Sequence, residues 1–149
     1  MRPALFMDRD GVINVDKGYV HRIEDWEWRP GIFDVIRGFK ALGHLVVGVT
    51  NQSGIGRGMF DQAQYRTLTN YYTGILESMG ARVDAVYHCP HTPDDNCDCR
   101  KPKPGLILWA AATHDIDLAA STLIGDRETD IEAGLAAGVG HLILWKQGA

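Results

Sequence analysis

Short apolar runs alternate along the chain with longer segments in which apolar residues recur every three or four positions. The short runs have the length and the polar or glycine boundaries of buried strands. The longer segments have the spacing of one helix face. Strands that alternate with helices predict a parallel sheet with helices on both faces, a doubly wound, Rossmann-like α/β fold. The predicted strands cover residues 4–7, 45–49, 85–87, 122–124 and 142–144.

Local signals predict where the helices begin and end. One helix is expected over residues 32–42, from its apolar spacing alone. Asp61 with Gln64 three residues later predicts a capping box at the start of the next, which would end at Gly80. Pro104 suits the first turn of a third helix, and the last is expected from about residue 128 to residue 138.

The first apolar run is followed directly by two aspartates. Asp8 and Asp10 come after residues 4–7, and Gly11 then lets the chain turn away without a side chain that would block the site. Open α/β sheets build their sites at the carboxyl ends of their strands. Two carboxylates there can divide the chemistry, since one can attack or bind a metal ion while the other moves a proton. An acidic turn that only ends a strand is the alternative.

Other strand ends carry complementary chemistry. Residues 50–54 form a polar turn whose hydroxyl and backbone N–H groups could hold a phosphate; a plain hydrogen-bonded turn is the alternative. The fourth strand ends near Asp126, with Asp130 one helical turn later. Strand-end carboxylates of this kind suit a hard divalent cation such as Mg²⁺. Lys101 adds a positive charge that could neutralise a transferring phosphoryl group.

The cysteines lie in one short segment together with a histidine. Cys89, His91, Cys97 and Cys99 offer four ligands, the complete set for a tetrahedral structural Zn²⁺ site. A closed four-ligand site leaves no position for a catalytic water, so this metal would organise the loop. A disulfide or unconnected thiols are the alternatives. A bridge between Cys97 and Cys99 would be badly strained, and a cytoplasmic setting disfavours disulfides.

The composition bounds the class of protein. The 149 residues have a size common for one domain, and the apolar content of 45% is ordinary for a globular protein. A net charge of −4 gives no electrostatic reason to expect nucleic acid or an anionic membrane as partner. No apolar stretch approaches the roughly 20 residues of a membrane helix, and no signal peptide is apparent. We therefore expect a single cytoplasmic domain over residues 1–149. We also expect a monomer, although nothing in the sequence determines the oligomeric state.

Four motifs, in order, resemble those of the haloacid dehalogenase superfamily of phosphotransferases. They lie at residues 8–12, 50–54, 100–102 and 125–130, and the resemblance covers essentially the whole chain. It implies a phosphatase that acts on a small phosphorylated molecule. The alternative from another class is a non-catalytic, zinc-stabilised phosphate-binding domain, but a binder would need neither a nucleophile nor a proton shuttle.

The resemblance implies a role for each motif. Asp8 would be the nucleophile that becomes an aspartyl-phosphate, and Asp10 would protonate the leaving oxygen and then activate water. Asp8, the backbone carbonyl of Asp10 and Asp126 would bind Mg²⁺. Lys101 would neutralise the phosphoryl oxygens. The substrate site would contain Thr50, Asn51, Gln52, Ser53, Arg57, Arg100, Lys101, Asp16 and Tyr19, with Arg127 and Asp130 in support.

The cysteine segment resembles one branch of the superfamily. Arg100 and Lys101 follow the last predicted zinc ligand directly, so bound Zn²⁺ would present both cations toward the active site. The branch contains heptose-bisphosphate 7-phosphatases and histidinol-phosphate phosphatases, which lack a large cap domain and use short loops around the substrate.

Two substrates follow from this branch. Residues 14–21 and 54–58 look like the heptose-bisphosphate phosphatases, and we expect removal of the 7-phosphate from D-glycero-D-manno-heptose 1,7-bisphosphate. The short acidic loop at residues 92–96, with Arg127, is also similar to the histidinol-phosphate group, so histidinol phosphate is the alternative. A sugar with a second phosphate would account for spare cations, namely Arg57, Arg100 and Lys17.

Overall fold

A five-stranded, entirely parallel sheet forms the centre of the protein in a computed structural model that describes residues 1–146. The strand order β3-β2-β1-β4-β5 places the first strand in the middle. The strands confirm the predicted ones, and four of them run one or two residues further. They are β1 (Ala4–Met7), β2 (Leu45–Asn51), β3 (Ala85–Cys89), β4 (Thr122–Gly125) and β5 (His141–Leu144).

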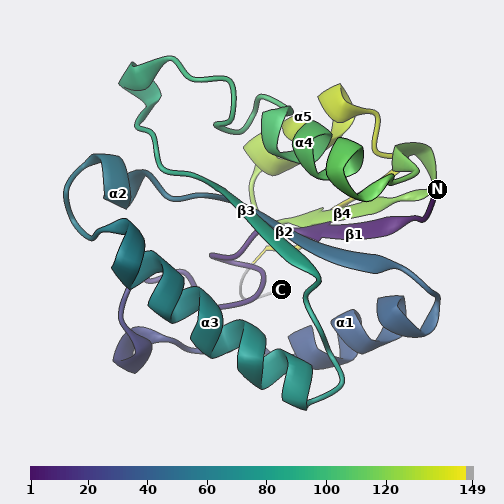
Figure 1. The fold of residues 1–149 in the computed structure, drawn as a ribbon, viewed down its shortest axis with the longest axis horizontal. Helices are drawn as coiled ribbons and strands as arrows, with labels where there is room; N and C mark the ends of the chain where they lie inside the picture. Colours follow the sequence, from purple (N-terminus) through teal and green to yellow (C-terminus); the bar gives the residue numbers. More distant parts are fainter. Residues whose placement is uncertain (147–149) are drawn as a thin grey trace.

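Helices cover both faces of this sheet (Figure 1). Two of them, α1 and α3, lie on one face, and α4 and α5 lie on the other. The predicted doubly wound α/β fold is confirmed. The α-helices are α1 (Ile32–Ala41), α2 (Ser53–Gly56), α3 (Gln62–Ser78), α4 (Gly105–His114) and α5 (Glu128–Ala137), and the 3₁₀ turns are η1 (Ile23–Asp25), η2 (Pro93–Asp95) and η3 (Leu118–Ala120).

The helix ends follow the local signals closely. The capping box of α3 is present, since the backbone N–H of Gln64 donates to the Asp61 carboxylate at 2.7 Å and the Gln64 side chain accepts in return. Gly138 ends α5 in the left-handed region, at φ 89°. Pro104 departs slightly from the prediction. It stands just before α4 rather than in its first turn, which begins at Gly105.

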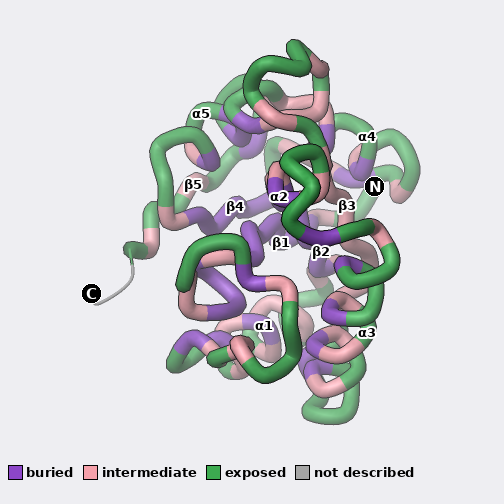
Figure 2. The backbone as a smooth tube through the Cα atoms, turned by 90° about the vertical axis from the view of Figure 1, so that its left-hand side faces the viewer, coloured by how far each residue is buried: buried purple, intermediate pink, exposed green. Residues whose placement is uncertain are grey.

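The central strand β1 is buried along its whole length, and Figure 2 shows its neighbours β2 and β4 mostly buried as well, whereas the edge strand β5 is largely exposed. Leu5 and Met7 face the apolar cluster beneath α1 and α3, whereas Ala4 and Phe6 face the cluster beneath α4 and α5. Successive side chains of a strand point to opposite faces. An uninterrupted apolar run is therefore what a strand with helices on both sides requires.

Parallel strands place all their carboxyl ends at one edge of the sheet. The loops after β1, β2 and β4 therefore meet there, although Asp8 and Asp126 are 118 positions apart in the sequence.

None of the described helices has the length and apolar character needed to span a membrane.

Shortening Leu76 to alanine tests the packing of α3 on the sheet. Leu76 is fully buried, so we expect Leu76→Ala to lower the free energy of unfolding by about 2–5 kcal/mol. Leu135→Ala is the matched control because Leu135 lies on helix α5 and is 70% exposed. Leu135→Ala should change the free energy of unfolding by no more than about 0.5 kcal/mol. Urea denaturation measures the free energy of unfolding of both variants, and equal losses would contradict the burial of Leu76 on α3.

Candidate active site

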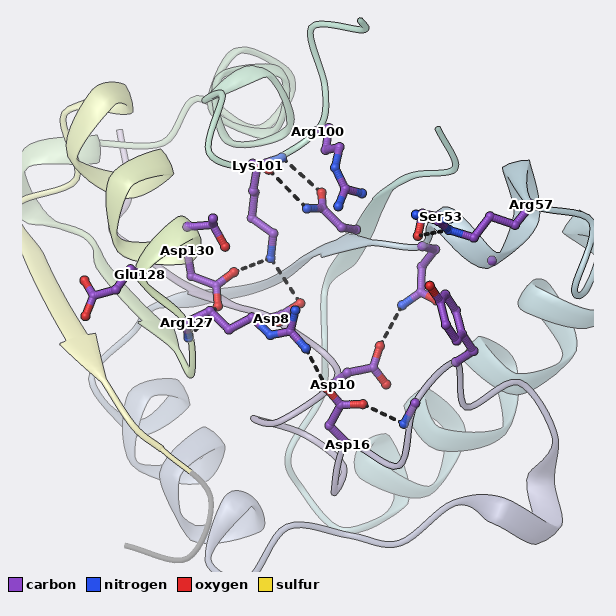
Figure 3. A pocket seen from close by; sticks show the side chains of 16 residues that line it. Asp8, Asp10, Asp16, Ser53, Arg57, Arg100, Lys101, Arg127, Glu128 and Asp130 are labelled. Carbon is purple, nitrogen blue, oxygen red and sulfur yellow. Dashed lines mark hydrogen bonds and ion pairs between the residues drawn. The ribbon is translucent and has the colours of Figure 1, made fainter. Parts of the chain in front are cut away.

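A cavity of about 610 Å³ opens at the carboxyl ends of the strands (Figure 3). Its lining contains most of the predicted site. Thr50 and Asp126 are not among the lining residues, although both belong to the same motifs. The predicted residues that line it are Asp8, Asp10, Asp16, Tyr19, Asn51, Gln52, Ser53, Arg57, Arg100, Lys101, Arg127 and Asp130.

The ammonium group of Lys101 lies between two carboxylates at the floor of this cavity (Figure 3). Its Nζ is 3.1 Å from Oδ1 of Asp8 and 2.5 Å from Oδ1 of Asp130, and it donates to the Val49 carbonyl at 2.9 Å. All of these charged side chains are nearly inaccessible to solvent. A buried charge needs partners of opposite sign, so Lys101 fixes both carboxylates in place.

Asp8 is the most strongly perturbed carboxyl group at this floor. Burial raises its pKa to about 7, and the opposing charge of Lys101 only partly offsets this effect. The backbone N–H of Arg9 also donates to Oδ1 of Asp8 at 2.8 Å. A further positive charge beside Asp8 would favour its ionised form, which is the form that a nucleophile needs.

The carboxylates at this floor fit a hard divalent cation. Asp8, Asp126 and Asp130 each offer an oxygen, and these oxygens lie within 4.8 Å of one another. Oδ1 of Asp126 is buried and has no hydrogen-bond partner within residues 1–146. Burial, with the nearby Asp130 charge, raises the pKa of Asp126. Mg²⁺ prefers oxygen ligands of this type, so the residues present fit the predicted magnesium ion.

The side chain of Asp10 belongs to a separate hydrogen-bond network. Its carboxylate accepts from the guanidinium of Arg9 at 2.9 Å, from Nδ2 of Asn14 at 3.1 Å and from Nε2 of Gln52 at 3.1 Å. It is not part of the carboxylate cluster that fits a metal. Asp8 and Asp10 therefore occupy different electrostatic surroundings, as two carboxylates with different tasks require.

Side chains at the end of β2 and in the turn after it form hydrogen bonds with other residues of the site. Nε2 of Gln52 also donates to the Thr50 hydroxyl at 2.9 Å, so Thr50 lies behind Gln52 rather than on the cavity wall. The side-chain amide of Asn51 contacts the backbone of Lys101 on both sides, accepting from its N–H at 3.0 Å and donating to its carbonyl at 3.3 Å. Asn51 therefore sets the position of the Lys101 loop.

Positive side chains surround the mouth of the cavity. Arg57 lies beside Ser53, with 3.4 Å between its Nε and the serine hydroxyl, and Arg127 pairs with Asp16 at 3.0 Å. Arg100 lines the same cavity. Lys17 does not: it pairs with Glu27 at 3.2 Å, outside the lining. The structure therefore does not bring Lys17 to the cavity with Arg57 and Arg100, and its ammonium pairs with Glu27 instead.

The cysteine segment forms a compact four-residue cluster beside the cavity. Sγ of Cys89 is 3.5 Å from Sγ of Cys97 and 2.6 Å from Sγ of Cys99, and Nδ1 of His91 is 3.3 Å from Cys99. The three thiols are free of disulfides. A tetrahedral zinc site with bonds of about 2.3 Å holds sulfurs about 3.7 Å apart. The cluster therefore has the ligand types of a zinc site, and Cys97 lies at the matching distances of 3.5 and 3.7 Å from the other two sulfurs, whereas Cys89 and Cys99 lie closer together than bound zinc would hold them.

The neighbouring His88 is not part of this cluster. Its ring stacks on Tyr65 at 4.1 Å and Nε2 contacts the Gln62 side chain at 2.9 Å. This agrees with the sequence pattern, in which only His91 has the spacing of a ligand. From the cluster the chain passes directly to Arg100, whose Nη1 contacts the His91 carbonyl at 3.5 Å.

Comparison with known proteins places these features in a family. The HAD-hydrolase-like family model matches residues 98–149. The D-glycero-β-D-manno-heptose-1,7-bisphosphate 7-phosphatase of Helicobacter pylori (strain J99) is 48% identical over 145 residues, which cover 97% of this chain and 83% of that protein. The enzyme of the same name from Escherichia coli K12 is 46% identical over 153 residues, 98% of this chain and 80% of that protein. The chain belongs to the heptose-1,7-bisphosphate 7-phosphatase family.

A solved structure supports the same assignment. The D,D-heptose 1,7-bisphosphate phosphatase from B. bronchiseptica, complexed with magnesium and phosphate, matches with a TM-score of 0.88 and 38% identity. The match covers 96% of this chain and 80% of that one. The resemblance to the haloacid dehalogenase superfamily is therefore confirmed, and residues 1–146 form the α/β core without a large cap domain.

Some lining residues were not predicted from the sequence. Glu128 and Thr129 follow Arg127 in the last motif, and Gly18 lies in the loop after β1. Glu128 and Thr129 could have been found, because they begin α5 at the end of β4. Gly18 offers no side-chain signal, since only the path of the loop brings it to the cavity.

Replacing Gly11 by alanine tests the fit of a metal beside Asp126. Gly11 has φ +92°, and a Cβ there would lie 2.0 Å from Oδ2 of Asp126. We expect Gly11→Ala to displace this carboxylate and to raise the Mg²⁺ concentration needed for phosphate release at least about tenfold. Titration of activity with Mg²⁺ measures this.

Gly138→Ala separates the clash from backbone strain. Gly138 has a similar φ of +89°, but a Cβ there would meet nothing within 4 Å. Both variants bear a comparable strain of about 1–2 kcal/mol. An unchanged Mg²⁺ requirement is expected for Gly138→Ala, and the same shift in both variants would contradict the assigned contact.

Elemental analysis tests the cysteine cluster. We expect about one zinc per chain in the unmodified protein, and clearly less in Cys99→Ser and His91→Asn because each loses a ligand. His88→Asn is the matched control, since His88 is adjacent in sequence but outside the cluster. Full zinc content in both ligand variants would remove these residues from a metal site.

Proposed function

We propose that this protein is a Mg²⁺-dependent phosphatase that removes the 7-phosphate of D-glycero-D-manno-heptose 1,7-bisphosphate. The observation that carries the proposal is the buried carboxylate of Asp8 at the floor of a polar cavity, where it contacts the ammonium of Lys101 and belongs to the group of carboxylates that fits a metal. The identity of 48% to a protein named for this activity supports the substrate. The relatives' names specify the β anomer, which we propose for this chain as well.

The first step transfers the phosphoryl group to the protein. An oxygen of Asp8 attacks phosphorus, and the bond between phosphorus and O7 of the heptose breaks. Asp10 gives its proton to O7, so that the sugar leaves as an alcohol. Mg²⁺, held by Asp8, Asp126 and the backbone carbonyl of Asp10, would supply positive charge for the nucleophile and the phosphoryl oxygens.

The second step hydrolyses the aspartyl-phosphate. Asp10, now a carboxylate, takes a proton from water as the water oxygen attacks phosphorus. The bond between phosphorus and Asp8 breaks, which restores the carboxylate and releases inorganic phosphate. Lys101 stabilises the negative charge in both steps because its buried ammonium lies 3.1 Å from the attacking carboxylate. Thr50 and the backbone of the turn after β2 would hold the phosphoryl oxygens.

The second phosphate of the substrate would meet the cations at the mouth. Arg57, Arg100 and Arg127 line the cavity beyond the reacting end. Lys101 is locked between two carboxylates and serves the transferring group instead. Asp16 and Tyr19, on the loop after β1, also line the cavity, and we propose that they bind the sugar hydroxyls.

A bound Zn²⁺ would act on the substrate site indirectly. Cys99 directly precedes Arg100 in the sequence, and Lys103 donates from its Nζ to the Cys97 carbonyl at 2.7 Å. A metal held by the cluster would therefore fix the loop that presents Arg100 and Lys101.

We also propose that the protein acts as a cytoplasmic monomer with a single domain over residues 1–149.

Histidinol phosphate is the second candidate substrate. The short acidic loop around η2 and the Arg127 that follows Asp126 favour it. It carries one phosphate and would leave the cations at the mouth without a partner. The two substrates therefore differ in the part of the cavity that they use.

Phosphate release from both substrates in the presence of Mg²⁺ tests the proposal. We expect kcat/KM for the heptose bisphosphate to exceed that for histidinol phosphate, because only the heptose offers a second phosphate to the cations at the mouth of the cavity.

Asp8→Asn should abolish turnover, since an amide cannot form the aspartyl-phosphate intermediate. Asp10→Asn should lower kcat roughly 10²–10⁴-fold.

Asp34→Asn controls for the loss of one surface charge, because Asp34 lies on α1 with its side chain 89% exposed. Its activity should equal that of the unmodified protein. A kcat/KM for histidinol phosphate equal to or above that for the heptose would overturn the substrate. Turnover by purified Asp8→Asn would overturn the mechanism.

A further inference from the structure

A fully buried guanidinium lies directly behind the proposed acid/base. Arg9 is only 1% exposed, although it stands between two residues of the cavity. Its Nε and Nη2 donate to Oδ1 of Asp10 at 3.2 and 2.9 Å, and Nη2 also contacts Oδ2 at 3.1 Å. Burying a charge is costly unless it is paired and hydrogen-bonded. Asp10 is the anionic partner of Arg9 within the described residues.

Aromatic side chains also lie close to this guanidinium. It lies 6.0 Å from the ring of Trp26, which in turn stacks on Tyr72 of α3 at 4.6 Å. Burial lowers the pKa of Arg9, but the charge of Asp10 and the nearby Tyr72 and Tyr65 outweigh burial and raise it. Arg9 therefore stays charged, and its position is determined by the core as well as by Asp10.

Two amide groups complete the hydrogen bonds to Asp10. Nδ2 of Asn14 donates to Oδ1 and Nε2 of Gln52 donates to Oδ2, both at 3.1 Å. Because donors reach both oxygens from three different side chains, the plane of the carboxylate is fixed. Among these donors only Arg9 contacts both oxygens.

The same guanidinium also holds the loop that lines the cavity. Nη2 of Arg9 donates to the carbonyl of Val20 at 2.7 Å. Val20 is buried and directly follows Tyr19, which lines the cavity, as does Asp16 earlier in the same loop. One side chain thus connects the acid/base to the loop that would contact the leaving sugar.

We propose that Arg9 is a positioning residue for proton transfer: it orients the Asp10 carboxylate and couples that orientation to the loop of residues 16–20. This inference rests on the proposed function, because it takes Asp10 as the group that donates the proton to the leaving oxygen. Arg9 lies outside the lining of the cavity and acts only through Asp10 and the loop.

The proposal has a consequence that depends on the leaving group. A sugar alcohol must be protonated as it departs, whereas an acidic phenol leaves readily as an anion. Weak positioning of Asp10 should therefore slow the transfer from alkyl phosphates more than the transfer from phosphates of acidic phenols. A general loss of folded protein would slow all substrates equally.

Arg9→Lys, which keeps the charge but loses the planar fork, is the variant that tests this. The measurement is kcat/KM for the heptose bisphosphate and for a series of aryl phosphates whose phenols differ in acidity. We expect a loss of about 10–100-fold for the heptose substrate and of less than about threefold for the most acidic phenol. In an Asp10→Asn background, Arg9→Lys should cause almost no further loss, because residues that act through one another are non-additive.

Arg82→Lys is the matched control, since Arg82 is 62% exposed and should show no change with any substrate. Equal losses across the whole series, or full additivity with Asp10→Asn, would overturn the proposal. Arg9→Gln, which retains an amide donor, takes its place if Arg9→Lys does not fold. Failure of both to fold would also overturn it, because Arg9 would then serve the core alone.

The two proposals can fail separately. If the unmodified protein cleaves aryl phosphates but neither heptose bisphosphate nor histidinol phosphate, the proposed substrate is wrong, while the dependence on phenol acidity still tests Arg9. If Asp8→Asn retains turnover, the proposed mechanism is wrong and the premise of the Arg9 proposal fails with it. A uniform loss in Arg9→Lys, with Asp8→Asn inactive, overturns the Arg9 proposal alone.

Discussion

The buried ion pairs of Lys101 are the constraint on which the site depends. A single ammonium neutralises both Asp8 and Asp130. Asp8 directly follows the end of β1, and Asp130 lies in the first turn of α5. Without it, two buried carboxylates would face each other in a region of low dielectric, at high energetic cost. The sheet brings the strand ends together, but the shared cation makes their close approach stable.

The position of Lys101 is in turn set by the elements around it. Asn51 at the end of β2 contacts its backbone on both sides, and the Val49 carbonyl accepts from its ammonium. The cysteine cluster lies immediately before it in the chain. A metal bound by this cluster would not contact the cavity floor, yet it would fix the segment that carries Lys101 and so help to set where the Lys101 ammonium lies.

Asp8 and Asp10 lie close together in the sequence, but their carboxylates have different interaction partners. Asp8 lies beside Lys101 and the metal-type carboxylates, where burial raises its pKa. Asp10 accepts hydrogen bonds from Arg9 and two amides instead. Arg9, between them, points away from the cavity into the core.

The sequence by itself determined the fold class, the strand ends that carry chemistry, and the ligand cluster. An uninterrupted run such as residues 4–7 has one stable placement between two helical layers, and motifs of short range such as the Asp61 capping box need no distant partner. Only the tertiary structure decided which long side chains meet. Lys17 turned to Glu27, Asp130 joined Lys101, and Arg9 became buried behind Asp10. Flexible charged side chains have many rotamers, and the one adopted depends on partners far away in sequence.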